Sequence, residues 1–503
     1  NMTPLPQIHT MRKMIVDGSA TSGFQRTALV ALNGAIDQTC RIETVAVEED
    51  ACQRVTDQVF SVDRLGIPLI EITTAPCMKT PEQVHDVAQY IGMTLRSTGR
   101  VKRGLGTIRQ DVNVSIRDGA RVEIKGVQEL DLIAEVVRRE VQRQLSLLAI
   151  KDELIARNAL VNGEVYDVTS VFAKTQSQVL KKAKVILGTV LHGFAGLVGM
   201  EIQPGRRLGS EMSDYAKKCG VGGLFHTDEL PAYGVTAEEV SVLKESLGAG
   251  EQDAVIIVAA TEQKSRCAIQ MIIRRAKMAM EGVPEETRKM LEGGSTAYMR
   301  PLPGAARMYP ETDILPVPVT QEYWESITTP ELLIDKAERF VHEYGLDAGM
   351  AHQIAFSEKL PLFERAVSEG IRPVFAARTI LASLKELSRA GISPDAIPDD
   401  SVIAVMKAVE TGHAAKEAVS EILSACARGM TLEEAIETVA PAFSREELQT
   451  LVHTIVSERV DFIKSRGKAA LGPVMGVVMK EVRGRIDGKV VSEVLEEELG
   501  RII

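Results

Sequence analysis

Residues 67–72 read IPLIEI, a short β-prone run in which the carboxylate of Glu71 stands between apolar neighbours. Burying a carboxylate within an apolar strand is costly unless the group is paired or binds a metal. We therefore expect this strand to belong to a mixed front domain, and we take Glu71 as its first candidate site residue.

The segments around this run predict an α+β fold. Residues 45–47 form another β-prone run, and residues 111–116 alternate apolar and polar side chains as a half-buried strand does. A helix is predicted to begin after Thr80, because its hydroxyl can accept from the N–H of Gln83, whose side chain can reach back to the cap. From residue 131 to about 148 the apolar spacing becomes helical.

Four acids stand on or beside predicted strands of this front domain: Glu48, Glu71, Asp111 and Glu123. Carboxylates on rigid strands suit Mg²⁺, which typically takes one or two carboxylates together with substrate phosphates. This is the chemistry of phosphoryl transfer. The alternative for any single acid is an ordinary solvent-facing position or an ion pair with a neighbouring Arg or Lys. The four acids together favour a shared site.

The segment at residues 104–107, GLGT, follows two basic residues and precedes Arg109. Its backbone amides and the flanking cations could surround a phosphate. It lacks the third glycine of a dinucleotide-binding fingerprint and the ending of a P-loop, so a tight turn between strands is the alternative. The candidate phosphate-binding residues are Lys102, Arg103, Gly104, Gly106, Arg109 and Lys125.

The rest of the chain divides into three further predicted parts. A β-prone run at 254–258 and a helical pattern at 268–280 indicate an α/β insert, and a proline-rich connector near 301–318 leads into helical patterns that continue to the end. The predicted domains are a mixed α/β cradle (1–165 and 293–320), the α/β insert (166–292), a helical domain (321–443) and a small helical tail domain (444–503).

The tail carries a local excess of positive charge. Between residues 462 and 489, seven basic residues stand against two acidic ones, which gives +5 in a chain whose net charge is −10. A basic helical surface suits an RNA backbone, although a solvated helix surface is the alternative. The candidate RNA-binding residues are Lys464, Arg466, Lys468, Lys480, Arg483, Arg485 and Lys489.

Bulk composition narrows the class of protein. The 503 residues, of which 45% are hydrophobic and 25% charged, predict about three globular domains. The apolar runs are too short to span a membrane, so we expect a cytoplasmic protein without a membrane partner. The net negative charge argues against non-specific nucleic-acid binding by the whole surface. The six cysteines are scattered, so reduced thiols and no zinc site are expected.

Several of these segments resemble the GatB/GatE family, the tRNA-binding kinase subunits of tRNA-dependent amidotransferases. The resemblance is carried by residues 47–51 (VEEDA), 63–72 (DRLGIPLIEI) and 108–115 (IRQDVNVS). Residues 22–27 and 102–107 favour the archaeal E-type chain over the B-type chain. The insert strengthens that choice, because it resembles a domain of bacterial aspartyl-tRNA synthetases that B-type chains lack.

The resemblance implies a two-step reaction on Glu-tRNA(Gln). ATP phosphorylates the γ-carboxylate of the tRNA-bound glutamate, and ammonia from an asparaginase-like D-type partner then displaces phosphate, so a hetero-oligomer is expected. By this resemblance Glu48 and Glu71 match the Mg²⁺ carboxylates, while Asp111 and Glu123 match acids of the same cradle. Glu48, Glu71 and Asp111 are then the expected catalytic residues, with Lys125 and Arg109 as cationic partners.

The sequence also departs from the family pattern. The cradle of the family begins with a Gly-Leu-Glu-Ile-His strand that supplies a Glu and a His, and His9 cannot be matched to it. A non-catalytic tRNA-binding scaffold that lacks a complete metal site is therefore the alternative to an ATP-dependent ligase component. A relative of aspartyl-tRNA synthetase fits the insert alone and is disfavoured.

Overall fold

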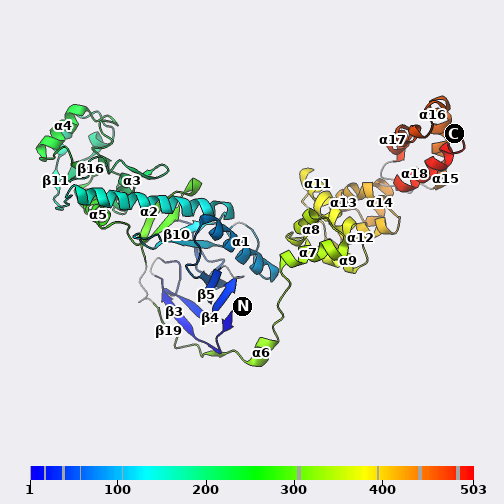
Figure 1. Ribbon diagram of the computed structural model, residues 1–503, viewed down its shortest axis with the longest axis horizontal. Coiled ribbons are helices and arrows are strands. Elements are labelled where there is room, and N and C mark those ends of the chain that lie inside the picture. The colour runs from blue at the N-terminus through cyan, green and yellow to red at the C-terminus, as the bar shows by residue number, and fades with distance from the viewer. Residues whose placement is uncertain are drawn as a thin grey trace. The chain divides into compact units, whose positions relative to one another are not determined.

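The computed structural model describes residues 2–502 except 16–17, 37–39, 57, 105, 303–307, 394–395, 440–444, 483–485 and 487. The chain forms two compact units, Asn1–Thr329 and Pro330–Ile503 (Figure 1). The first unit mixes helices and strands and the second is helical, which confirms the predicted α+β class and the helical C-terminal region. In the described part of the chain, no helix is both long and apolar enough to cross a membrane.

The first sheet of the first unit is antiparallel and carries two of the predicted acids. Its strand order is β19-β3-β4-β5-β8, with β1 (Thr3–Pro4) paired to β4. The bounds are β3 (Thr10–Met14), β4 (Phe24–Ile36), β5 (Cys40–Glu49), β8 (Pro68–Thr74) and β19 (Met308–Pro310). The β-prone runs at 45–47 and 67–72 thus lie in the adjacent strands β5 and β8, as strands were predicted there.

The second sheet carries the other two acids. Its strand order is β18-β17-β10-β9. The pair β10 and β17 is parallel, whereas the pairs β9 with β10 and β17 with β18 are antiparallel. The bounds are β9 (Gln110–Val114), β10 (Val122–Val127), β17 (Glu286–Met290) and β18 (Thr296–Pro301). Alternate residues of β9 and β10, including Val112 and Ile124, are buried against helix α2 (Ile133–Ala156). The opposite face of these strands therefore carries the polar side chains.

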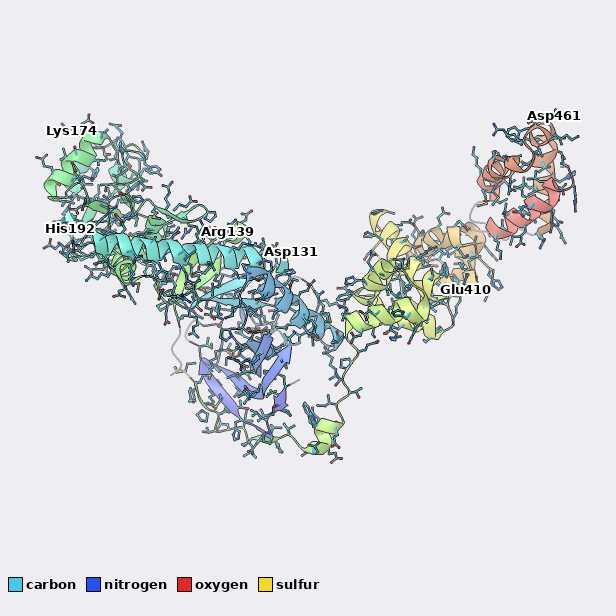
Figure 2. All side chains as sticks on the ribbon, in the orientation of Figure 1. Asp131, Arg139, Lys174, His192, Glu410 and Asp461 are labelled. Carbon is cyan, nitrogen blue, oxygen red and sulfur yellow. A yellow bond between two sulfur atoms is a disulfide. The ribbon has the colours of Figure 1, made fainter. Side chains whose placement is uncertain are left out.

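Helix α1 (Pro81–Ser97) packs beside α2 and begins with the predicted capping box. The Thr80 hydroxyl accepts from the N–H of Gln83 at 3.2 Å, and the Gln83 side chain accepts from the N–H of Thr80 at 3.3 Å. Helix α2 continues beyond the predicted end near residue 148, because Ile150 and Leu154 extend its buried face into the insert. Figure 2 shows α2 running from Asp131 past Arg139 toward the part of the insert that carries His192.

The third sheet, in the order β11-β12-β16-β15, forms the insert together with three helices. The elements are β11 (Tyr166–Asp167), β12 (Val185–Leu191), α3 (Leu208–Lys217), β15 (Phe225–His226), α4 (Ala237–Ser246), β16 (Ala254–Ala260) and α5 (Glu262–Glu281). Strand β16 contains the run predicted at 254–258, and α5 contains the predicted helix. Strand β17, within the range predicted for the insert, instead pairs with β10. The exact domain boundaries stay a prediction.

Three short strand pairs complete the first unit, and α6 (Gln321–Glu325) lies near its end. The pairs are β2 (Gln7–Ile8) with β20 (Val317–Pro318), β6 (Gln53–Arg54) with β7 (Phe60–Ser61), and β13 (Glu201–Gln203) with β14 (Arg206–Arg207).

A buried network of ion pairs joins α2, α3, α5 and β17. Arg143 of α2 contacts Glu211 of α3 and Glu286 of β17, each at 2.7 Å, and Arg275 of α5 donates to Glu211. All of these side chains are buried. Burial opposes the charge on Glu211, but Arg143, Arg288 and Arg275 hold its pKa well below the usual range. The network therefore attaches the insert to the cradle strands through charged groups.

The cysteines contradict the expectation of reduced thiols. The structure joins Cys219 to Cys267 and Cys40 to Cys77 in disulfides, whereas Cys52 and Cys426 are free. The members of each pair stand 48 and 37 residues apart in the sequence. Folding brings them together from different elements, so their spacing along the chain did not indicate the pairing.

The second unit consists of helices with separate apolar cores. The first part contains α7 (Leu333–Tyr344), α8 (Ala348–Ala355), α9 (Leu360–Ser368), α10 (Pro373–Arg378), α11 (Leu384–Arg389), α12 (Asp399–Glu410), α13 (Val419–Ala427) and α14 (Leu432–Val439). An apolar face at residues 402–409 is buried in α12, and the Thr431 hydroxyl accepts from the N–H of Glu434 at the start of α14. The last part contains α15 (Arg445–Ser457), α16 (Val460–Arg466), α17 (Leu471–Val482) and α18 (Gly488–Leu499), which share one core.

Candidate active site

The register of β5 and β8 brings Glu48 and Glu71 to one face of the first sheet. Ala46 lies opposite Glu71 and Glu48 lies opposite Leu69. Because residues opposite each other in an antiparallel pair, and residues two apart in one strand, point to the same side, the two carboxylates are diagonal neighbours. The structure therefore places two acids predicted from the sequence side by side.

Two side chains from the neighbouring strands hold Glu48. The Lys13 ammonium of β3 lies 3.0 Å from Oε1, and the Gln25 amide of β4 donates to Oε2 at 3.3 Å. The Glu48 side chain is only 8% exposed, so these contacts supply much of the solvation that burial removes. They hold the Glu48 carboxylate in a fixed position on the sheet.

Glu71 stands in a different environment, because its side chain is exposed at the sheet surface whereas Glu48 is buried. Within the residues that the structure describes, neither a hydrogen bond nor an ion pair reaches its carboxylate. Its pKa is raised, first because the surrounding protein desolvates it and then because Glu48 and Asp111 repel its charge, while Lys13 and Lys125 act in the opposite direction. The ionised form of Glu71 would thus be stabilised by an added cation.

The second sheet contributes a linked acid–base–acid group. Lys125 of β10 lies 2.5 Å from Asp111 of β9 and 3.2 Å from Glu123 of its own strand. The Thr287 hydroxyl of β17 donates to the second oxygen of Glu123 at 2.9 Å. Burial alone would lower the pKa of Lys125, but the two carboxylates raise it above its ordinary value. Lys125 is therefore a firmly protonated cation close enough to influence Glu71.

The three consecutive acids at residues 48–50 each form an ion pair with a different basic side chain. Glu48 contacts Lys13 as described, Glu49 pairs with Arg26 at 3.1 Å, and Asp50 pairs with Arg109 at 3.0 Å. Arg109, a candidate phosphate ligand, therefore already forms an ion pair with Asp50, directly after β5. Of the three acids, Glu48 is the one that faces Glu71.

The remaining candidate phosphate residues form the loop before β9. Gly104 and Gly106 have φ angles of +107° and +80°, a conformation that favours glycine. The Thr107 hydroxyl donates to the carbonyl oxygen of Gly104 at 2.8 Å, which closes a tight turn. Lys102 is exposed and Arg103 is half-buried. This geometry agrees with the turn that the sequence left as the alternative, and it does not by itself indicate a bound phosphate.

The four acids do not form a ready-made metal cage. Over the described ranges, no three or more His, Cys, Asp or Glu side chains lie close enough together to hold a metal ion. Mg²⁺ commonly keeps several waters and takes one or two protein carboxylates with substrate phosphates. The pair Glu48 and Glu71 is compatible with that requirement, because no cation contacts the Glu71 carboxylate directly, and the repulsion from Glu48 and Asp111 is opposed only at longer range by Lys13 and Lys125.

Sequence reasoning missed three groups of this site: Lys13, Gln25 and Thr287. Lys13 reaches Glu48 across 35 residues of sequence, and Thr287 reaches Glu123 across 164. Lys13 and Gln25 do lie in strands with alternating side chains, but this alternation does not indicate which residues of the neighbouring strands they contact. Only the pairing of the strands brings them to the acids.

Four of the predicted RNA-binding residues lie on helices of the tail. Lys464 and Arg466 are exposed on α16, and Lys480 and Lys489 are exposed on α17 and α18. The Arg466 guanidinium lies 5.2 Å from the centre of the Phe462 ring. Arg483 and Arg485 lie outside the described residues, as does the side chain of Lys468.

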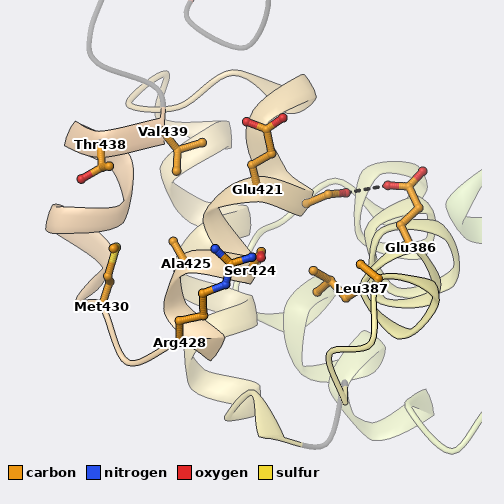
Figure 3. Close-up of a pocket in the computed structure, with 11 residues that line it drawn as sticks. Glu386, Leu387, Glu421, Ser424, Ala425, Arg428, Met430, Thr438 and Val439 are labelled. Carbon is orange, nitrogen blue, oxygen red and sulfur yellow. Dashed lines mark hydrogen bonds between the residues drawn. The ribbon is translucent and has the colours of Figure 1, made fainter.

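A cavity of about 400 Å³ lies in the second unit among α11, α13 and α14 (Figure 3). Glu386, Ser424 and Arg428 contribute its polar groups, and Leu387, Met430 and Val439 contribute apolar surface. None of the acids or cations predicted from the sequence lines it. The candidate active site is instead the polar surface formed by the two sheets of the first unit.

Comparison with known proteins identifies the family of this chain. The family described as the GatB/GatE catalytic domain matches residues 1–325, and the GatB domain matches residues 361–499. The E-type chain of glutamyl-tRNA(Gln) amidotransferase from Methanospirillum hungatei is 62% identical over 502 residues, covering 100% of this chain and 82% of the relative. The E-type chains of Methanosarcina barkeri and Methanocaldococcus jannaschii are 52% and 48% identical over 100% of this chain and 82% and 83% of the relatives. The chain therefore belongs to the GatB/GatE family, within its group of archaeal E-type chains of glutamyl-tRNA(Gln) amidotransferase.

Proposed function

We propose that this chain activates Glu-tRNA(Gln) by transferring the γ-phosphoryl group of ATP to the side-chain carboxylate of the tRNA-bound glutamate. The phosphorylated carboxyl group is then a substrate for ammonia, which displaces phosphate to give Gln-tRNA(Gln). The observation that carries the proposal is the unpaired Glu71 carboxylate beside Glu48 and Asp111, at a surface that calls for added positive charge.

The reaction requires such charge because both reactants are anionic. A carboxylate oxygen attacks the γ-phosphorus while the bond to the bridging oxygen breaks and ADP leaves, so negative charge accumulates at the transferring group. Mg²⁺ held by Glu48 and Glu71 would supply positive charge to the nucleotide phosphates. Lys13 and Gln25 fix Glu48 in place, which keeps that ligand oriented before substrate arrives.

Lys125 supplies a second source of positive charge. Its contacts with Asp111 and Glu123 hold the ammonium on the polar face of the second sheet. We infer that it faces the phosphate chain, with Lys102, Arg103 and the amides of Gly104 and Gly106 as further phosphate ligands. Arg109, fixed on Asp50, would position this loop.

The proposal includes partners and cofactors. ATP and Mg²⁺ are required for the phosphoryl transfer, and an asparaginase-like D-type partner supplies ammonia in a cytoplasmic hetero-oligomer. The basic surface of α16, α17 and α18 binds the tRNA backbone, which carries the glutamate to the site. The relatives support this reading, because their names give glutamyl-tRNA(Gln) amidotransferase as the enzyme to which they belong.

The test uses the chain assembled with its ammonia-supplying partner. ADP release should require Glu-tRNA(Gln) and should stay at background with uncharged tRNA(Gln) or Gln-tRNA(Gln). Adding ammonium should convert the Glu-tRNA(Gln) to Gln-tRNA(Gln). A complex that binds Glu-tRNA(Gln) but releases no ADP in response would contradict the proposal and identify the chain as a tRNA-binding scaffold.

A further inference from the structure

Arg300 lies on β18, at the edge of the second sheet, in a row with residues of the candidate active site. It stands opposite Thr287 of β17, which stands opposite Glu123 of β10. Glu123 in turn stands opposite Asn113 of β9. The register therefore brings Arg300 to the polar face that carries Glu123 and Lys125, although it is separated from both by more than 170 residues of sequence.

The Arg300 guanidinium has no protein partner in the part of the chain that the structure describes. Its Nε is closed off from solvent and donates no hydrogen bond. Arg288, on the opposite face of the adjacent strand, provides a contrast, because it contacts Glu286 and donates to the Thr296 hydroxyl at 2.7 Å. Buried donors are normally satisfied, so the unpaired Nε of Arg300 is an exception.

The acid of this row, Glu123, is already bound by two other side chains, and it accepts no hydrogen bond from Arg300 among the described contacts. One oxygen of Glu123 accepts from Lys125 at 3.2 Å and the other accepts from Thr287 at 2.9 Å. Burial works to raise the pKa of Glu123, but Lys125, Thr287 and, at longer range, Arg300 hold it below its ordinary value. Arg300 thus contributes charge to the face while no described side chain accepts a hydrogen bond from its guanidinium.

We propose that Arg300 binds a phosphate group of the nucleotide, on the same face as Lys125. This inference rests on the proposed ATP-dependent function and adds a ligand that the sequence did not indicate. The planar guanidinium offers paired donors that match phosphate oxygens, which an ammonium group does not. The nucleotide is favoured over a phosphate of the tRNA backbone because the strand register places Arg300 on the face that carries Glu123 and Lys125, two residues of the candidate active site.

The test compares Arg300→Gln, Arg300→Lys and the control Arg117→Gln in the assembled amidotransferase. Arg117 is exposed in the turn between β9 and β10, so its replacement removes the same charge outside the proposed site. The apparent KM is measured separately for ATP and for Glu-tRNA(Gln), and the melting temperature of each variant is recorded. Glu71→Gln is assayed alongside to report on the proposed function itself.

Arg300→Gln should raise the KM for ATP by about tenfold or more, the order of a lost charge-assisted contact, and leave the KM for Glu-tRNA(Gln) unchanged. Arg300→Lys should recover only part of this loss, and Arg117→Gln should match the wild type. An unchanged KM for ATP in a folded Arg300→Gln, or a shift confined to the tRNA, would overturn the inference. If the wild type itself shows no ATP dependence, the proposed function fails instead.

Discussion

At the scale of single residues, the environment of Glu71 affects folding as well as ligand binding. A carboxylic acid whose pKa is raised in the folded state binds its proton more tightly when folded, so stability is lost as the pH rises from the ordinary glutamate range through the raised pKa. Glu71→Gln cannot ionise. Without Mg²⁺, we predict that this variant melts at a higher temperature than the wild type at a pH of about 7.5, with the difference vanishing at about pH 4.

Thermal denaturation followed by circular dichroism at the two pH values checks this prediction. Glu43→Gln is the matched control, because Glu43 is exposed on β5, the strand that carries Glu48. It should change the melting temperature little at either pH. A Glu71→Gln protein that is less stable than the wild type near neutral pH would show that the carboxylate is already well compensated.

The sequence predicted the acids of the site better than their partners. Glu48, Glu71 and Asp111 could be found because a carboxylate inside a β-prone run is unusual wherever it occurs. Lys13 and Arg300 carry no comparable local signal, since basic residues on strands are common on solvent-facing surfaces. Their roles depend on strand pairing between segments far apart in the chain, which spacing within one segment does not specify.

At the scale of elements, α2 shows why the length of a helix can be underestimated from the sequence. Its buried face includes the fully buried Glu140, Arg143 and Gln144 among apolar residues. In the sequence these polar residues indicate a solvent face, so the apolar periodicity weakens before the helix ends. Strand β17 was missed for the same reason, because Glu286 and Arg288 are buried polar residues within it.

The buried ion network makes a prediction at this scale. Arg143→Met removes the guanidinium that lies between Glu211 and Glu286 and leaves buried carboxylates without their partner. We expect the free energy of unfolding of the first unit to fall by about 3–5 kcal/mol, the range for breaking a buried pair. Urea titration followed by circular dichroism measures the loss.

Arg139→Met is the comparison, because Arg139 lies one turn earlier on α2 and its ion pair with Glu135 is partly exposed. Its replacement should cost less than about 1 kcal/mol. Equal losses in the two variants would show that the network contributes no more than a surface ion pair.

At the scale of the whole molecule, composition and pattern predicted the α+β class and the helical second unit. The finer domain boundaries remain predictions, because the contacts of the chain define two units, Asn1–Thr329 and Pro330–Ile503. Within the second unit, α15 to α18 bury a core made of their own residues between 448 and 499. The basic tail is therefore a coherent part whose removal can be tested.

Deleting residues 445–503 should weaken binding of tRNA(Gln) and lower its dependence on salt. Each lost phosphate contact should reduce the slope of log K against log salt by roughly 0.7–0.9. Filter binding over a series of salt concentrations provides the measurement. The double variant Lys464→Gln and Lys480→Gln, at two exposed positions, should reproduce part of the effect without a deletion. An unchanged slope in both proteins would identify the basic surface as ordinary solvated surface.

The central claim is tested most directly by single-turnover phosphoryl transfer in the assembled complex. Glu-tRNA(Gln), Mg²⁺ and ATP labelled in the α-phosphate are mixed with wild type or Glu71→Gln, and ADP and Gln-tRNA(Gln) are measured before and after ammonium is added. The wild type should release ADP and form Gln-tRNA(Gln), whereas Glu71→Gln should do neither while binding Glu-tRNA(Gln) with unchanged affinity. Wild-type turnover in Glu71→Gln would contradict the assignment of this carboxylate to the phosphorylating site.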